Sequence, residues 1–160
     1  MAVDIFLKVE GIEGETQDHQ HKDQMEIRDY AWKMTSPRDS FTGQVSGKPR
    51  VENLTVLKRV DKGTPKFMEA LVKNKNLGYA TLSFRKAGLQ AGAKPQMDYL
   101  VIKLSDVYVA EWSPAGTDGD ALLEKIAFNF RKFDVLYKMQ KEDGTPAGEV
   151  SAGYDASAHK

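Results

Sequence analysis

Alternation of apolar and polar side chains with a period of two residues runs through most of the chain and constrains its fold more than any other feature. Because successive side chains of a strand point to opposite faces, this pattern is typical of half-buried β-strands. It recurs in six runs: residues 3–9, 25–35, 51–60, 79–86, 97–112 and 126–139. Turn signals separate the runs, for example at Gly11, Lys62-Gly63, Ala87-Gly88 and Asp143-Gly144. The pattern predicts a mainly β chain.

The alternation changes phase inside the stretch KIAFNFRKFDVLYKM, Lys125 to Met139. Its apolar residues form two sets of opposite parity, the first being Ile126, Phe128 and Phe130 and the second Phe133, Val135, Tyr137 and Met139. Such a shift turns the apolar face over unless the backbone kinks. We therefore expect a bulge, a barrel corner at Arg131 and Lys132, or a strand whose outer half meets another subunit. One set is expected in the core and the other is a candidate for a seam between subunits; parity alone leaves open which is which.

Two further stretches carry more apolar surface than one small barrel needs. The apolar parity of residues 25–35 shifts after Ile27, which fits a bulge, a barrel corner or a strand whose outer half meets another subunit. In residues 97–112 apolar side chains occupy both parities, at 100–102 and again at 107–109. Strands that read this way are covered on both faces, so we expect both faces of this stretch to be covered.

One helix is predicted in TPKFMEALVKN, from about Pro65 to Asn74. Thr64 is positioned to cap it, and Pro65 fits its first position. Its apolar residues fall on one face: Phe67, Met68, Leu71 and Val72. With a single helix among the strands, we predict one domain over residues 1–160. It forms a compact β-barrel of two packed antiparallel sheets, with the helix on an open end or flank.

Charge and cysteine content exclude several classes of partner and site. The chain has 23 Lys plus Arg against 23 Asp plus Glu, so neither nucleic acid nor an anionic membrane is favoured as a partner. It has no cysteine, which excludes disulfides and thiolate metal sites. Asp4, Lys8 and Glu10 interrupt the apolar residues of the opening stretch, unlike a secretory signal. No run approaches the roughly 20 apolar residues of a membrane span, so we expect no membrane insertion. If the chain leaves the cell, we expect a route without a cleaved signal peptide.

Few residues suggest catalysis or a bound group. His19 and His21 resemble a metal pair, but no third ligand is fixed nearby and the surrounding QDHQHKD is polar, so a solvated loop is favoured. The serines lack a GxSxG elbow, and no two carboxylates stand out by their spacing. The glycine stretches lack the spacing of a phosphate cradle. We predict that the protein is not an enzyme and has no metal and no cofactor.

The stretch SPRDSFTGQVSGKPR, Ser36 to Arg50, is a long polar connection with two prolines, two glycines and the isolated apolar residues Phe41 and Val45. Loops longer than about 12 to 15 residues are usually functional or disordered. We therefore interpret this stretch as an arm that contacts a partner, the alternative being a disordered tip.

Several segments follow one another in a distinctive order: MAVDIFLKVEGIEGET, DYAWKM before the long loop, VDKGTPKFMEALVKN, LSFRKAG, MDYLVIKLSDVYV, and EKIAFNFRKFDVLYKMQKEDGTPAG followed by GYD. This order closely resembles the Hcp family, the haemolysin-coregulated proteins that form the tube of the bacterial type VI secretion system. The resemblance covers nearly the whole chain.

The resemblance implies a β-barrel subunit that assembles into a hexameric ring with a wide central channel. Rings would stack into a tube inside a contractile sheath, carry a spike of the VgrG type, and hold effector proteins in the lumen. The subunit would be cytoplasmic before firing and extracellular afterwards. The architecture also resembles that of phage tail tube proteins.

The family pattern assigns expected roles to two segments of this chain. The Ser36–Arg50 loop corresponds to the part that reaches the adjacent ring, which gives four ring-stacking candidates: Arg38, Phe41, Val45 and Lys48. The stretch Glu111 to Asp118 corresponds to a region near the channel, which gives Trp112 and Ser113 as lumen or rim candidates. The competing interpretation is a small-molecule-binding β-barrel in which Trp32, Trp112 and the phenylalanines line a closed pocket.

Overall fold

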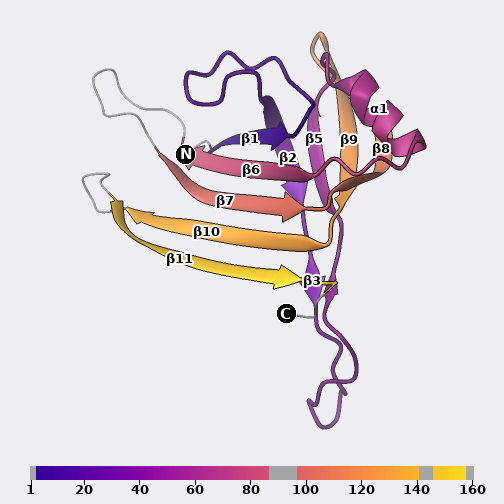
Figure 1. The fold of residues 1–160 in the computed structure, drawn as a ribbon, viewed down its shortest axis with the longest axis vertical. Helices are drawn as coiled ribbons and strands as arrows, with labels where there is room; N and C mark the ends of the chain where they lie inside the picture. The colour runs from indigo at the N-terminus through magenta and orange to yellow at the C-terminus, as the bar shows by residue number, and fades with distance from the viewer. Residues whose placement is uncertain (1–2, 87–96, 141–145, 158–160) are drawn as a thin grey trace.

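The computed structural model describes residues 3–86, 97–140 and 146–157, and Figure 1 shows its fold. The elements in chain order are β1 Val3–Val9, β2 Met25–Ala31, β3 Met34–Thr35, β4 Arg50–Val51, β5 Leu54–Arg59, α1 Thr64–Val72, β6 Tyr79–Lys86, β7 Asp98–Ser105, β8 Tyr108–Asp118, β9 Ala121–Asn129, β10 Lys132–Gln140 and β11 Pro146–Asp155. The turns predicted at Ala87-Gly88 and Asp143-Gly144 lie outside the described residues. Within the described part, no helix has the length and apolar character that crossing a membrane requires.

Nine strands form one continuous antiparallel sheet, in the order β11-β10-β7-β6-β1-β2-β5-β9-β8, while β3 and β4 pair in a small second sheet. In Figure 1, β6, β7, β10 and β11 run across the view, and β5 and β9 run along the long axis of the molecule. The large sheet therefore folds over on itself at the pairing of β1 with β2. The predicted fold class is confirmed: the chain is mainly β, with one helix and two antiparallel sheets.

The core lies between the two halves of the large sheet. Its most deeply buried apolar side chains come from both halves: Leu7, Met25, Leu54, Val56, Leu82, Leu104, Ile126 and Phe128. The helix adds Phe67, which is fully buried and meets Phe128 edge-on with ring centroids 5.8 Å apart. Burial of one such side chain stabilises the fold by about 1.5–3 kcal/mol, so the alternating residues of both halves hold the sheet in its folded-over shape.

The phase change in residues 125–139 is confirmed as a corner. The strand β9 ends at Asn129 and pairs with β5 and β8, whereas β10 begins at Lys132 and pairs with β7 and β11. The chain therefore crosses from one half of the sheet to the other within two residues. Both apolar sets begin in the core, where Phe128 and Phe133 are buried, and only the far end of the second set, at Tyr137 and Met139, is exposed.

Of the other two stretches with unusual parity, the first has a local explanation. The register of β2 against β5 shifts between Ile27 and Asp29, which is the signature of a β-bulge. As a result Tyr30 pairs with Val56, although its position in the sequence has the parity opposite to that of Ile27. The run 97–112 is divided by a turn at Asp106, whose φ of 54° is left-handed, into β7 and β8. The bulge therefore accounts for the shift in residues 25–35. The turn only separates residues 100–102 from 107–109, and within β7 both faces remain apolar, with Val101 half-buried opposite the buried Ile102.

The helix differs from its prediction in its cap and its buried face. It spans Thr64–Val72 with Gly63 at the N-cap, no side chain caps it, and Pro65 lies in its first turn. The predicted cap is wrong because the Thr64 hydroxyl donates to Glu124 instead. The predicted apolar face is also partly wrong.

The buried face of the helix is formed by Thr64, Phe67 and Ala70, with Leu71 packed at the edge of the core. Met68 and Val72 are 42% and 72% exposed. The helix meets the sheet mainly through β8, and this docking selects a narrower stripe than the apolar pattern suggested.

A buried ion pair joins β5, β9, β8 and α1. Lys58 and Glu124 are 1% and 0% exposed, and the Lys58 Nζ lies 2.7 Å from the Glu124 Oε1. The other Glu124 oxygen accepts from the Trp112 Nε1 at 3.0 Å, and both oxygens lie 2.9 Å from the Thr64 hydroxyl. Lys58 also donates to Asp61 and to the Arg59 carbonyl. Each charged group here therefore has hydrogen-bonding partners. We call Lys58, Glu124, Trp112, Thr64 and Asp61 the buried charge cluster.

The loop between β1 and β2 covers the outer face of the sheet. Phe6 belongs to that face, and the His21 ring stacks on it with centroids 4.3 Å apart. His21 is only 5% exposed and bonds to Gln24 and Asp98, each at 2.9 Å. The interpretation of both histidines as members of a solvated loop is therefore wrong for His21. Its ring stacks on Phe6 and both of its ring nitrogens form hydrogen bonds, so the side chain is buried. His19 is exposed.

Arg85 attaches the same loop to the sheet. Arg85 on β6 donates to both oxygens of Asp18, at 3.0 and 2.6 Å, and to Asp4 at 3.1 Å. Its guanidinium lies 5.0 Å from the centre of the Phe6 ring. Chiefly because Arg85 donates to it, the pKa of the Asp18 carboxyl falls from its ordinary 3.8 to about 2.

Removal of one partner of the buried charge cluster should strongly destabilise the fold. We expect Glu124→Ala to lower the free energy of unfolding by about 3–5 kcal/mol, because Lys58 would remain charged and buried without its main partner. Urea unfolding followed by circular dichroism measures this. The matched control is Glu69→Ala, which removes an exposed ion pair with Lys73 on α1 and should leave the midpoint unchanged. An equally small effect of Glu124→Ala would contradict a structural role for the cluster.

The contact between Asp18 and Arg85 should make the attachment of the loop sensitive to acid. Since the folded-state pKa is depressed, the stabilisation is fully present above the unfolded value of 3.8 and is lost as the pH falls towards about 2. The difference in unfolding free energy between the parent chain and Asp18→Asn should therefore be constant from neutral pH down to about 4 and shrink below it. A difference that grows on acidification would mean that the contact does not form.

Candidate functional site

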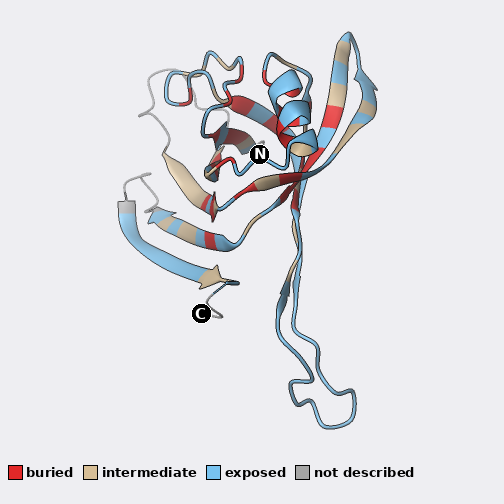
Figure 2. Cartoon of the chain, turned by 45° about the vertical axis from the view of Figure 1, so that its right-hand side comes forward, coloured by how far each residue is buried: buried red, intermediate tan, exposed pale blue. Residues whose placement is uncertain are grey.

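The predicted long loop is an arm that projects from the body of the molecule. It continues the β2–β5 strand pair: β3 and β4 pair at its root, and residues 36–49 beyond them are all exposed. In Figures 1 and 2 the arm extends along the longest axis, away from α1 and from the loop between β1 and β2. The arm therefore adds no burial to the core.

The tip of the arm is ordered by its own hydrogen bonds. The Asp39 carboxylate accepts from the backbone N–H groups of Phe41 and Thr42 at 2.8 and 2.9 Å, and these bonds lower its pKa. The Arg38 guanidinium donates to the Gly43 carbonyl at 3.0 Å, and Gly43 adopts a left-handed φ of 73° that closes the turn. The alternative of a disordered tip loses its support, because a polar turn of this kind is preformed.

The four ring-stacking candidates occupy different parts of the arm. Phe41 lies at the tip and is 97% exposed, while Val45 is 60% exposed and forms a bridge with Arg38. Lys48 lies near the root, in the wall of a small cavity. The structure therefore brings Arg38, Phe41 and Val45 together and separates Lys48 from them.

Aromatic rings hold the arm to the body at its root. Trp32 donates from its Nε1 to the Glu52 carbonyl at 3.0 Å and meets the rings of Phe130 and Phe133 edge-on, with centroids 5.9 and 5.2 Å away. Tyr154 on β11 packs beside Phe133. We call Trp32, Phe130, Phe133 and Tyr154 the arm seat.

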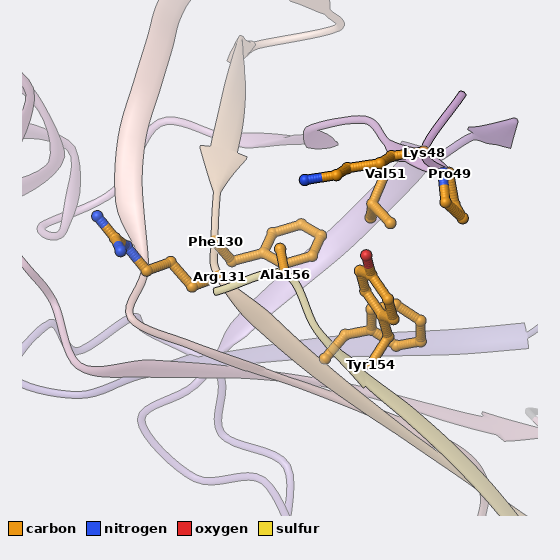
Figure 3. A pocket seen from close by; sticks show the side chains of 8 residues that line it. Lys48, Pro49, Val51, Phe130, Arg131, Tyr154 and Ala156 are labelled. Atoms are coloured by element: carbon orange, nitrogen blue, oxygen red, sulfur yellow. The ribbon is translucent and has the colours of Figure 1, made fainter. Parts of the chain in front are cut away.

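A cavity of about 160 Å³ lies beside the arm seat. Figure 3 shows Lys48 and Val51 of the arm root facing Phe130 and Tyr154, which come from the corner after β9 and from β11. The sequence did not identify the seat as a functional feature. Its signal was the phase change at Arg131 and Lys132, because the corner carries Phe130 and Phe133 to the arm root.

The two lumen or rim candidates point to opposite sides of β8. Trp112 pairs with the buried Ile126, packs against the core and reaches Glu124 with its indole N–H. Ser113 pairs with the exposed Lys125 on the outer side of the sheet. Ser113 therefore lies on the outer side of the sheet and Trp112 on its core side.

In the part of the chain that the structure describes, both edge strands of the large sheet are long and pair on one side only. Among the described strands, the 11-residue β8 pairs only with β9 and the 10-residue β11 pairs only with β10. Exposed apolar side chains lie close to these edges: Leu122 on β9, Tyr137 and Met139 on β10, and Val150 on β11. Open edges of this length readily pair with another chain.

Other chemistry finds little support in the described residues. No group of three His, Cys, Asp or Glu side chains there is arranged to hold a metal ion. Trp32 and Trp112 do not line a common pocket, since the first packs in the arm seat and the second on the buried charge cluster. The small-molecule barrel therefore loses two of the residues on which it rested.

Comparison with known proteins gives consistent relatives. Residues 6–137 match the family described as "Type VI secretion system effector, Hcp". Protein hcp1 of Pseudomonas aeruginosa is 35% identical over 161 aligned residues, which cover 97% of this chain and 96% of the relative.

Solved structures agree with this match. Hcp1 from Salmonella typhimurium is 32% identical with a TM-score of 0.81, and the match covers 100% of this chain and 99% of that one. A type VI secretion system effector from Yersinia pestis is 29% identical with a TM-score of 0.76, and the match covers 95% and 99% of the two chains. The chain belongs to the Hcp family of type VI secretion system proteins, and its role is that of a tube subunit.

Proposed function

We propose that six copies of the chain close into a ring through the two free edges of the large sheet. The observation that supports this most is the pair of long open strands, β8 and β11, at opposite ends of one strand order. A contact between different surfaces of identical subunits forms a closed ring when its rotation divides a full turn. Exposed apolar residues beside these edges would be buried in such a contact.

The rings stack into a tube through the arms. Each arm projects along the long axis and carries an exposed Phe41 on a preformed turn. Aromatic side chains that fill a pocket of the partner are typical anchors of an interface, and Phe41 is free to take this role. Of the four stacking candidates, we assign the direct contact to Arg38, Phe41 and Val45, and the support of the arm root to Lys48.

The tube acts by enclosing and carrying other proteins rather than by bond chemistry. We propose a contractile sheath outside it, a VgrG-type spike at its end and effector proteins in its lumen. The subunit is cytoplasmic before firing and extracellular afterwards, without a cleaved signal peptide. Ser113, on the outer side of β8, is the lumen candidate, and Trp112 supports that strand from the core side as a rim residue.

A charge placed at the arm tip should separate stacking from ring formation. We expect Phe41→Asp and Val45→Asp to leave six-copy rings intact while abolishing tubes, because neither side chain contacts the body of its own subunit and a buried carboxylate would penalise the contact with the next ring. Light scattering measures the ring mass, and negative-stain electron microscopy at high protein concentration detects the tubes.

The matched control is Val72→Asp, which adds the same charge at a 72% exposed position on α1. It should still form tubes if the arm alone carries the axial contact. Rings that fall apart in the arm variants would show that the arm serves the ring itself, and tubes that persist would show that the tip is not needed.

A further inference from the structure

The strand pair that carries the arm ends in a hollow at the opposite end of the molecule. The β2–β5 pair runs from Met25 and Arg59 at one end to Ala31 and Leu54 at the arm. A hollow of about 270 Å³ opens at the first of these ends, lined by parts of β2, of the end of β5 and of the loop before β2. Figures 1 and 2 show this end and the arm at opposite ends of the longest axis.

We infer that this hollow receives the arm tip of a second copy of the chain in the next ring. This inference rests on the proposed stacking and adds the partner surface for it. Because arm and hollow lie at the two ends of one strand pair, copies stacked head to tail bring the arm of one towards the hollow of the next.

The charges of the two surfaces are complementary. The arm, residues 36–50, has three cationic side chains and one carboxylate, and that carboxylate, Asp39, is occupied by its own turn. The loop 10–24 beside the hollow has five carboxylates and one lysine. One of the five, Asp18, is already bound to Arg85. An excess of positive charge on the arm therefore meets an excess of negative charge on the loop.

The wall of the hollow contains carboxylates that could pair with a cationic side chain of the arm. Glu15 and Glu26 line it, and Glu26 has no ion pair with any described residue. Of the other charges of the wall, Arg28 is paired with Asp118 and Asp61 with Lys58. Arg59 adds one cation to the wall, so Glu15 and Glu26 together outweigh it by one negative charge.

Val60 in the same wall is 41% exposed, and its N–H bonds to Leu122, which is 61% exposed. We assign Phe41 of the arm to this apolar edge. Arg38 lies on the same turn of the arm as Phe41, so we assign it to Glu26.

Introduced cysteines test the contact, because the chain has none of its own. Ser40→Cys places a thiol beside Phe41 without removing it, and Val60→Cys places one in the hollow. Under mild oxidation of stacked rings, the double variant should give a ladder of multimers in denaturing gels, since each chain is linked head to tail. The control pair is Ser40→Cys with Val72→Cys, whose second thiol lies on α1 outside the hollow.

Each result decides for or against the hollow. A ladder from the first pair alone supports it. If tubes form but neither pair is linked, or only the control pair is, the hollow is wrong and the proposed tube stands. If neither variant nor the parent chain forms rings or tubes, the proposed function fails as well.

A charge exchange tests the assigned pair. One exposed ion pair changes an equilibrium by about 1.5-fold to fivefold, and two stacked six-copy rings would share six of them, so Arg38→Glu should raise the protein concentration needed for tubes by about tenfold or more. The double variant Arg38→Glu with Glu26→Arg should return that concentration towards the parent value, whereas Arg38→Glu with Glu69→Arg on α1 should not. Failure of the Glu26 variant to restore stacking would overturn the pairing.

Discussion

The half of the large sheet formed by β2, β5, β9 and β8 depends on the buried pair of Lys58 and Glu124. The pair fixes β5 to β9 at the end remote from the arm, and through Trp112 and Thr64 it also holds β8 and the start of α1. A buried pair of this kind is stabilising only while all its partners are present, so four elements share one arrangement. The strand β5, which carries Lys58, leads directly back to the arm, so this pair and the arm root lie at the two ends of one strand.

Three other features are arranged along the β2–β5 strand pair. One end of the β2–β5 pair carries a preformed arm that adds nothing to the core, and the aromatic arm seat braces its root against the corner between β9 and β10. The other end carries a hollow beside an acidic loop, which Arg85 and His21 hold against the sheet. Between them the sheet ends in two open edges. In the proposed assembly, this division separates the axial contacts from the lateral contacts within a single small domain.

Features encoded by local pattern could be predicted from the sequence, and features made by distant contacts could not. The corner at Arg131 and Lys132 and the bulge after Ile27 follow from parity, and the arm follows from its polar length. Lys58, Glu124 and His21 look like surface residues in their own segments. Their burial arises because partners 66 and 77 residues away supply the bonds. The exposure of Met68 and Val72 on α1 could not be predicted for the same reason, because the docking of the helix on β8 determines which of its side chains are buried.

The central claim is that this chain is one repeating unit of a closed ring that stacks. Sedimentation of the purified protein over a wide concentration range tests it most directly. A species of six times the 17.9 kDa chain mass, followed at higher concentration by longer particles built from that unit, is the predicted result. A chain that stays monomeric throughout, or that grows one subunit at a time without a dominant closed species, would contradict it.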